Sequence, residues 1–454
     1  MLEGPLLPSV ISYAIPIILT SILQLLFNAA DLVVVGQYCG SLSVAAVGAT
    51  SSLTILLVNF FMGFSIGAGA NMANAIGNCD HDLQHRIVHT ALSIALACGA
   101  FLTVVGVAMS ETFLIWMGTP QDVLPLSTVY MRIYFGGILF TMVYNFSAAI
   151  LRAAGDTRSP LVFLSLSGVV NVLLNFLLVT AFDMDVAGVA LATTVSQGVA
   201  AALTVRALIR RTDACRLQLH KIRFYKEPLK GIVQQGVPAA FQNSLFSISN
   251  VLIQSSINSF GEVVISGNSA AGSIEGFVYA GMDAFSQTSI NFTGQNAGAK
   301  QYKRVNKVLW TCLGCVTVVG AFMGAVAYLF APQLLGLYIT DSAQAIDYGI
   351  LRMSYVCVTY FLCGMMNVCT GSLRGMQVSF LPMLISVLGV CGIRIAWIYT
   401  IFQLPQFHTL ESLYISYPIS WMVTFAANLL ACILVYRKRL AMHREPGAFI
   451  NESS

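Results

Sequence analysis

Three acidic residues fall inside long apolar stretches of the chain, where a carboxylate is costly. They are Asp31, Glu275 and Asp283. A carboxylate near the centre of a bilayer costs roughly 2.5–3.5 kcal/mol on insertion scales, so it normally faces a cavity or a partner. Each of the three is therefore a candidate for binding a proton, a cation or a substrate.

Asp31 has the clearest setting of the three. Gln24, Asn28 and Asp31 follow an i, i+4, i+7 spacing, which places them on one face of an otherwise apolar helix. A carboxyl group on such a face can exchange H⁺ or Na⁺ according to the side it faces, although it can also be a hydrogen-bonding strut between helices. Pro16, earlier in the same stretch, removes a backbone hydrogen bond and predicts a bend or hinge.

Two asparagines and a threonine predict partners for Asp31. Asn171 and Asn175 are four residues apart on one helical face, and Thr193 lies in the next apolar stretch. Together with Asn28 and Asp31 they predict a cation-coupling pocket in the first half of the chain, with Asp31 as the candidate Na⁺ ligand. Asparagines between membrane helices can also be simple packing contacts.

The second half of the chain has its own polar residues in apolar stretches. Glu275, Tyr279 and Asp283 share a helical face, and Arg394 lies in the middle of a later stretch. Because an unpaired guanidinium is costly at that depth, we expect Glu275 or Asp283 to pair with Arg394. This pair could serve structure alone. A preceding stretch presents a further polar face with Asn243, Ser247, Asn250, Gln254 and Asn258. We expect Asn250, Gln254, Glu275, Tyr279, Asp283 and Arg394, with Gln24, to line a substrate cavity.

The composition indicates that these residues lie in a membrane protein. Hydrophobic residues make up 57% of the chain and charged residues only 9%, with a mean hydropathy of +0.78. So little charge cannot cover a soluble globule of this length. Continuous apolar runs of roughly 20 residues predict helices rather than a β-barrel. The twelve predicted spans are 9–35, 46–76, 87–109, 122–147, 159–181, 186–209, 233–259, 267–294, 305–330, 345–370, 378–402 and 413–436.

The chain is an internal duplication with a repeat distance of about 222 residues. The pairs that define it are Pro16 with Pro238, Asn28 with Asn250, Arg152 with Arg374, and Pro160 with Pro382. A membrane protein of two like halves usually binds its substrate where the halves meet. The predicted domains are a six-helix bundle (1–209), a basic cytoplasmic linker (210–230), a second six-helix bundle (231–440) and a cytoplasmic tail (441–454).

Basic residues predict the orientation. Lys and Arg occur after the even-numbered spans and are absent after the odd-numbered ones, so both termini are expected in the cytoplasm. Arg132 and Arg352, near span ends, are expected to extend toward the interface. The basic run 206–230 suits anionic lipid headgroups better than nucleic acid.

Four motifs resemble the multidrug and toxic compound extrusion (MATE) transporters, in particular their bacterial DinF-like branch. The motifs are NAADLVVVGQYCG (28–40), ILRAAGDTRSP (150–160), GQNAGAKQYKRV (294–305) and GSLRGMQVSFLP (371–382). The resemblance covers nearly the whole chain. It implies two six-helix bundles forming a V around a central cavity, with cation entry driving export of bulky organic, often cationic, compounds.

The resemblance also assigns residues. Asp31 stands where that branch has its first-helix acidic residue, Pro16 where the bending proline lies, and Asn171 at the fifth-helix asparagine. Asn175 departs from the pattern, because many members have aspartate there, so one titrating group is missing. The seventh-helix glutamate of the NorM-like branch is also absent, and Glu275 is the candidate to do comparable work.

The predicted function is a secondary-active multidrug antiporter of the cell membrane, exchanging inward H⁺ or Na⁺ for outward organic compounds by alternating access. No GxxxxGK[ST] phosphate-binding loop occurs, so ATP-driven pumping by this chain is not expected. We expect no cofactor, no enzyme activity and a monomer in the lipid bilayer. The alternatives are a lipid-linked oligosaccharide flippase of the same superfamily, a membrane-embedded enzyme and a channel.

Overall fold

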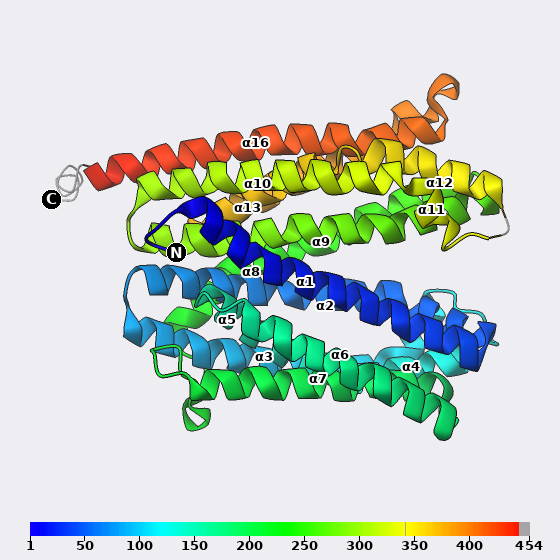
Figure 1. The fold of residues 1–454 in the computed structure, drawn as a ribbon, viewed down its shortest axis with the longest axis horizontal. Helices are drawn as coiled ribbons and strands as arrows, with labels where there is room; N and C mark the ends of the chain where they lie inside the picture. Colours follow the sequence, from blue (N-terminus) through cyan, green and yellow to red (C-terminus); the bar gives the residue numbers. More distant parts are fainter. Residues whose placement is uncertain (341, 445–454) are drawn as a thin grey trace. The chain divides into compact units, whose positions relative to one another are not determined.

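The computed structural model describes residues 1–340 and 342–444. Throughout these residues the regular structure is helical, as the coiled ribbons of Figure 1 show, which confirms the all-α prediction. The α-helices are α1 (Leu6–Val34), α2 (Ser41–Gly77), α3 (His81–Trp116), α4 (Leu124–Gly136), α5 (Ile138–Ala153), α6 (Arg158–Phe176), α7 (Asp185–Arg210), α8 (Lys226–Asn258), α9 (Glu262–Gly298), α10 (Tyr302–Leu329), α11 (Ala331–Gly336), α12 (Ala343–Val356), α13 (Tyr360–Gly375), α14 (Phe380–Ser386), α15 (Ile393–Tyr399) and α16 (Leu410–Arg444). The π-helical segments are η1 (Val35–Cys39), η2 (Leu177–Ala181) and η4 (Val387–Gly392), and the 3-10 segments are η3 (Leu219–Lys221), η5 (Ile401–Gln403) and η6 (Pro405–Phe407).

Each of the twelve predicted spans corresponds to one helix or to a run of consecutive helical segments in the described chain. Two spans are bent by 44°, one made of α4 and α5 and the other of α12 and α13. Another span consists of α14, η4 and α15. Among the described residues, eight segments are long and apolar enough to cross a membrane, or ten when each bent pair is taken as one span. The other two, α8 and α9, are long but more polar, as expected of helices that carry polar faces.

The chain divides into two compact units. Unit 1 consists of Met1–Ile18, Ala73–Cys79 and the chain from Phe241 onward, and unit 2 of Leu19–Met72 and Asp80–Ala240. The change from one unit to the other falls within α1 two residues after Pro16, and within α8 two residues after Pro238. Both prolines lie inside their helices and occupy equivalent positions in the two repeats. The duplication therefore extends to the place where each repeat's first helix leaves one unit for the other.

The predicted domain limits stay a prediction. In the segment expected to be a linker, α7 ends at Arg210, η3 follows, and α8 begins at Lys226. In the segment expected to be a tail, α16 continues to Arg444, and residues 445–454 lie outside the described residues.

Glycines allow helices to pack backbone against backbone inside each unit. In unit 1, a Cβ added at Gly371 of α13 would lie 2.6 Å from the carbonyl oxygen of Ser286 in α9. In unit 2, a Cβ at Gly99 of α3 would lie 2.8 Å from the Cα of Leu139 in α5. Since lipid supplies no hydrophobic force between helices, such close packing is a main source of their association.

Candidate functional site

Asp31 is partly buried in unit 2 and is held by neutral hydrogen-bond donors. Its Oδ1 accepts a hydrogen bond from the Nδ2 of Asn175 at 2.5 Å, and its Oδ2 accepts one from the Oγ1 of Thr193 at 3.1 Å. No basic side chain of the described residues hydrogen bonds to this carboxylate. Among the described residues, the hydrogen bonds to this carboxylate thus come from neutral dipoles.

Asn171 closes these contacts into a ring. The Nδ2 of Asn175 also lies 3.2 Å from the Oδ1 of Asn171, and the Nδ2 of Asn171 donates to Thr193 Oγ1 at 3.3 Å. Both asparagines are buried. The structure therefore brings together Asp31, Asn171, Asn175 and Thr193, which we call the Asp31 ring.

One acceptor of the Asp31 ring is unused. The Oδ1 of Asn175 is buried and has no hydrogen-bond partner in the described part of the chain. Burying such an oxygen without a partner costs about 1–3 kcal/mol. The ring thus combines a carboxylate, a hydroxyl oxygen and an amide oxygen without a hydrogen-bond partner in the described residues. Hard cations prefer oxygen ligands of these kinds.

Two π-helical segments fix the position of the Asp31 ring. η1 begins four residues after Asp31, and η2 begins two residues after Asn175. η1 packs against both η2 and α7, and α6 packs against α7. Valines from these elements form a small core next to the ring, made of Val34, Val35, Val179 and Val189. Wide helical turns of this kind are frequent at functional sites, and no sequence pattern used above predicts them.

Gly168 allows α1 to approach α6 beside the ring. A Cβ added at Gly168 would collide with the ring of Phe27 on α1. The aromatic ring takes the space that a side chain on α6 would occupy. This contact sets how near Asp31 comes to the asparagines of α6.

Gln24 and Asn28 lie on the same helix as Asp31 but take no part in the hydrogen bonds of the Asp31 ring. Both side chains are exposed on α1 within unit 2. Asn28, predicted as a member of the cation pocket, therefore stands apart from the hydrogen bonds that hold the carboxylate. Its part in cation coupling stays a prediction.

In unit 1, Glu275 is bound by Arg352 and not by Arg394. The two oxygens of Glu275 accept hydrogen bonds from the Nε and Nη2 of Arg352 at 2.6 and 2.7 Å, and both residues are buried. The third contact of Arg352 is to the Oδ1 of Asn268 at 2.6 Å. The predicted pairing of Arg394 with Glu275 is therefore wrong. The expectation that Arg352 extends toward the interface is wrong too, because its side chain is buried within unit 1 against Glu275 and Asn268.

Arg394 is held by neutral and aromatic groups. Its Nε donates to Ser420 Oγ at 3.0 Å, its Nη1 to Asn250 Oδ1 at 3.5 Å, and its guanidinium lies 4.1 Å from the ring centroid of Tyr417. The aromatic face offsets part of the cost of burying the charge. The other predicted partner, Asp283, accepts a hydrogen bond from Gln287 at 2.6 Å.

The remaining predicted cavity residues of unit 1 fall into two environments. Gln254 joins the interior network, because its Oε1 accepts from Asn268 Nδ2 at 2.8 Å. Tyr279 is 42% exposed, and Asn250 is exposed as well. The predicted substrate contacts of Asn250 and Tyr279 stay a prediction.

The family comparison agrees with the duplication. The MatE family model matches the chain twice, over residues 16–177 and 238–400. Each match covers most of one repeat. The two matches start at Pro16 and Pro238, the equivalent prolines of α1 and α8.

Known relatives and structures cover nearly the whole chain. It is 26% identical over 424 residues to Probable multidrug resistance protein YoeA of Bacillus subtilis, covering 91% of this chain and 90% of that protein. It is 25% identical over 348 residues to an FAD transporter of Shewanella oneidensis, covering 75% and 76%. A solved MOP superfamily transporter from Pyrococcus furiosus has a TM-score of 0.90 at 20% identity, covering 97% of this chain and 98% of that chain. The DinF-like branch stays a prediction, whereas the predicted family and twelve-helix fold class are confirmed: the protein belongs to the MatE family of membrane transporters.

Proposed function

We propose that this multi-pass membrane transporter is a secondary-active antiporter that exchanges inward H⁺ or Na⁺ for outward organic compounds. The observation that carries the proposal is the Asp31 ring, a carboxylate held inside a helical unit by neutral donors only. A transporter driven by a cation gradient needs a group that gains and loses a cation at no great cost. Asp31 has this property, whereas a carboxylate already paired with arginine does not.

For proton coupling, the ring offers partners to both forms of the carboxyl group. The ionised form accepts from Asn175 and Thr193. A protonated carboxyl group donates a hydrogen bond and needs an acceptor. The Oδ1 of Asn175, which has no partner in the described residues, can accept this bond after the amide rotates. For sodium coupling, the same oxygen and the carboxylate are candidate ligands.

Pro16 and Pro238 are the proposed hinges of alternating access. Each lies two residues before its helix passes from one unit to the other. Proline removes one backbone hydrogen bond, so bending there costs less than elsewhere in the helix. Asp31 lies on the same helix as Pro16. Binding or release of a cation at Asp31 can therefore bend the helix at Pro16.

Multidrug efflux is the proposed role, because several relatives are named probable multidrug resistance proteins. One relative is named an FAD transporter, so organic anions belong in the substrate screen as well. We further infer that both termini face the cytoplasm and that the transporter works as a monomer. The exposed polar side chains of α8 and α9, including Asn250 and Tyr279, are the proposed substrate contacts.

The proposal is tested with purified protein in sealed vesicles that contain a fluorescent organic cation. A proton gradient and a sodium gradient are imposed separately, and dye movement is followed in each. We expect counterflow under one of the two gradients for the wild type and none for Asp31→Asn. Dye movement without either gradient, at an equal rate in the variant, would indicate a channel or uniporter.

A further inference from the structure

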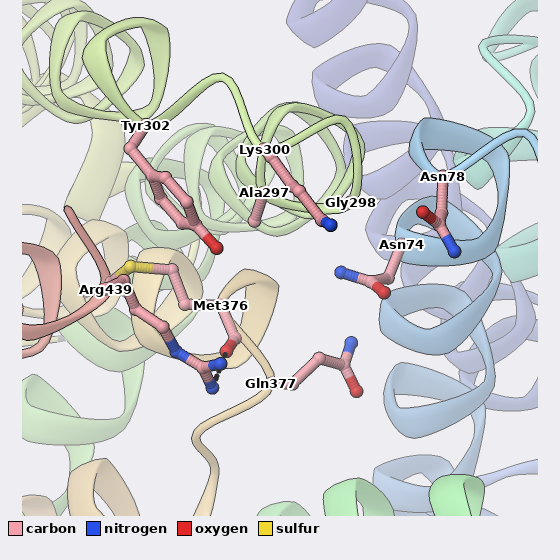
Figure 2. A pocket seen from close by; sticks show the side chains of 9 residues that line it. All are labelled: Asn74, Asn78, Ala297, Gly298, Lys300, Tyr302, Met376, Gln377 and Arg439. Atoms are coloured by element: carbon pink, nitrogen blue, oxygen red, sulfur yellow. Dashed lines mark hydrogen bonds between the residues drawn. The ribbon is translucent and has the colours of Figure 1, made fainter. Parts of the chain in front are cut away.

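A pocket with basic and amide side chains opens at one end of the unit 1 helices. Figure 2 shows the side chains around it, which come from segments far apart in the sequence. Its lining residues are Asn74, Asn78, Ala297, Gly298, Lys300, Tyr302, Met376, Gln377 and Arg439. All of these belong to unit 1, so the pocket lies within one compact body.

The pocket has a cationic and hydrogen-bonding lining. Lys300 and Arg439 carry positive charge, and none of the nine lining residues is acidic. The hydrogen bond of Arg439 in the described structure is a long one, from Nη2 to the carbonyl oxygen of Met376 at 3.5 Å. The hydroxyl of Tyr302 and the amides of Asn74 and Gln377 also point inward (Figure 2). Such a set of donors is complementary to a small anion with several oxygens.

The pocket lies where the spans end. It is formed by the last turn of α2, the end of α9, the first turn of α10, the residues after α13 and the last turns of α16. Ends of transmembrane helices lie at the depth of the lipid headgroups. The volume is about 250 Å³, which is below the ~300–1,000 Å³ of sites for drug-sized ligands. This size suits a headgroup phosphate better than a bulky transported compound.

Close packing of two helix ends forms one wall of the pocket. A Cβ at Gly298 of α9 would collide with the carbonyl oxygen of Asn74 in α2, and one at Gly77 would collide with the carbonyl oxygen of Gln295. The two helix ends therefore touch through their backbones. This contact brings Asn74 and Asn78 next to the end of α9, which leads to Lys300.

Two lining residues adopt a backbone conformation that favours glycine. Lys300 has φ +57° and Gln377 has φ +64°. In the first repeat the residue equivalent to Gln377 is Gly155, also at positive φ. A left-handed residue with a side chain costs roughly 1–2 kcal/mol, which glycine avoids. The second repeat bears this cost and gains an amide directed into the pocket.

We propose that this pocket binds a phosphate anion, as the headgroup of an anionic phospholipid or as free phosphate. Lys300 and Arg439 neutralise its charge, and Tyr302 with the amides of Asn74 and Gln377 donates hydrogen bonds to its oxygens. Basic pockets between transmembrane helices are known to hold such headgroups. The site is separate from the Asp31 ring and does not depend on the direction of transport.

The test measures thermal unfolding of the full-length protein in detergent with added phosphatidylglycerol. We expect the melting temperature to rise by about 2 °C or more with phosphatidylglycerol, and not with phosphatidylcholine. The double change Lys300→Gln with Arg439→Gln should move the half-effect concentration about tenfold upward. A dependence identical to that of the wild type would overturn the proposal.

The matched control is Lys303→Gln with Lys307→Gln. These lysines are exposed on α10 near the pocket but do not line it, and the pair removes the same charge. We expect the control to keep the wild-type response. An equal loss in both double variants would show that general surface charge attracts the lipid, and the pocket proposal would fail.

Gln377→Gly separates binding from folding. It restores the residue type of the first repeat at a position with positive φ, so the melting temperature without lipid should stay level or rise. The shift caused by phosphatidylglycerol should become smaller. An undiminished shift would mean that Gln377 does not contact the anion.

Inorganic phosphate distinguishes the two sources of the anion. If inorganic phosphate alone raises the melting temperature of the wild type, and raises it less in the Lys300→Gln, Arg439→Gln variant, the ligand is soluble phosphate. If only phosphatidylglycerol does so, the ligand is the lipid headgroup. If neither raises the melting temperature of the wild type, the inference is wrong, whatever the outcome of the vesicle transport assay.

Discussion

Unit 1 holds a buried acidic side chain and unit 2 a partly buried one, and they stabilise its charge in opposite ways. In unit 1, Glu275 is fixed by two hydrogen bonds from the guanidinium of Arg352. In unit 2, Asp31 is held by the amide of Asn175 and the hydroxyl of Thr193. The first acid has a cationic partner, whereas the second has neutral partners among the described residues.

This difference decides which acid can exchange a cation. To bind a proton or Na⁺, Glu275 would have to leave a buried guanidinium uncompensated, which costs several kcal/mol. Asp31 has only neutral partners to rearrange, each worth about 0.5–1.5 kcal/mol, or about 1.5–3 kcal/mol where a donor meets the charged carboxylate. Glu275 is therefore suited to holding α9 and α12 together, and Asp31 to a change of charge.

The duplication shows that the two halves have diverged at this point. The repeat equivalents of Asp31 and Asn171 are Ile253 and Ile393. Ile253 is 1% exposed and packs in an apolar cluster of unit 1. The ancestral helix position is thus a packing residue in one half and a charged one in the other. At this position only the first repeat therefore offers a carboxylate.

The largest expected effect is the loss of coupled transport in Asp31→Asn. The change removes the charge but keeps the size and the capacity for hydrogen bonds, so expression and melting temperature should stay near those of the wild type. Efflux of dye from vesicles under a cation gradient measures the effect. Wild-type rates would remove Asp31 as the coupling group, and a drop in folded yield would instead favour its reading as a structural strut.

The second prediction concerns stability. Glu275→Gln should destabilise the protein by about 3–5 kcal/mol, because it leaves Arg352 buried without its counter-ion. Melting of the purified variants in detergent checks this, with Asp31→Asn as the matched control for removing a buried acid.

The double change Glu275→Gln with Arg352→Gln should recover part of that loss, since it removes both charges. If the double variant loses more stability than the two single variants lose together, the ion pair does not hold these helices together. If Asp31→Asn is destabilised as much as Glu275→Gln, the contrast between the two sites does not exist.

Periodicity and composition predicted the spans and most of the Asp31 ring. Spacing along one helix placed Asn171 and Asn175 on a common face, and a charge in an apolar stretch singled out Asp31. These signals are local, so they appear in a single sequence. They also placed Asn28 beside Asp31, yet a shared face does not tell which of two residues a neighbouring helix will contact.

The partner of Glu275 could not be predicted in the same way. Arg352 lies near the end of its apolar stretch, where arginines usually reach the interface. The bend of 44° between α12 and α13, and the contact of Arg352 with Asn268, depend on how helices distant in sequence pack. The cation–π contact of Arg394 with Tyr417 likewise joins two spans, and it offsets part of the cost that led the sequence analysis to expect an acidic partner.

A smaller effect is expected from Asn175→Asp, which makes the Asp31 ring resemble the acidic pair of many family members. The new carboxyl would lie next to Asp31, where Asn175 Nδ2 now donates at 2.5 Å. Two such groups titrate as a coupled pair, so one of them keeps its proton at pH values where Asp31 alone would be ionised. We expect transport to persist with its pH profile moved upward. An unchanged profile, measured by dye efflux over a pH series, would mean that position 175 is not coupled to Asp31 during transport.

The smallest effect is expected at Asp213, which forms a solvent-exposed ion pair with Arg211 in unit 2. Arg211 contacts Asp213 at 2.5–3.1 Å, as close as Arg352 contacts Glu275, but the Asp213 side chain is 49% exposed. The hydrogen bond from Arg211 lowers the pKa of Asp213 below its ordinary value of 3.8. Its stabilising effect is therefore present at neutral pH and is lost as the pH falls through the lowered pKa.

Because solvent screens the pair, Asp213→Asn should cost no more than about 1 kcal/mol at pH 7. Melts of wild type and variant should converge in acid, and a loss as large as that of Glu275→Gln would show that burial does not set the strength of these pairs.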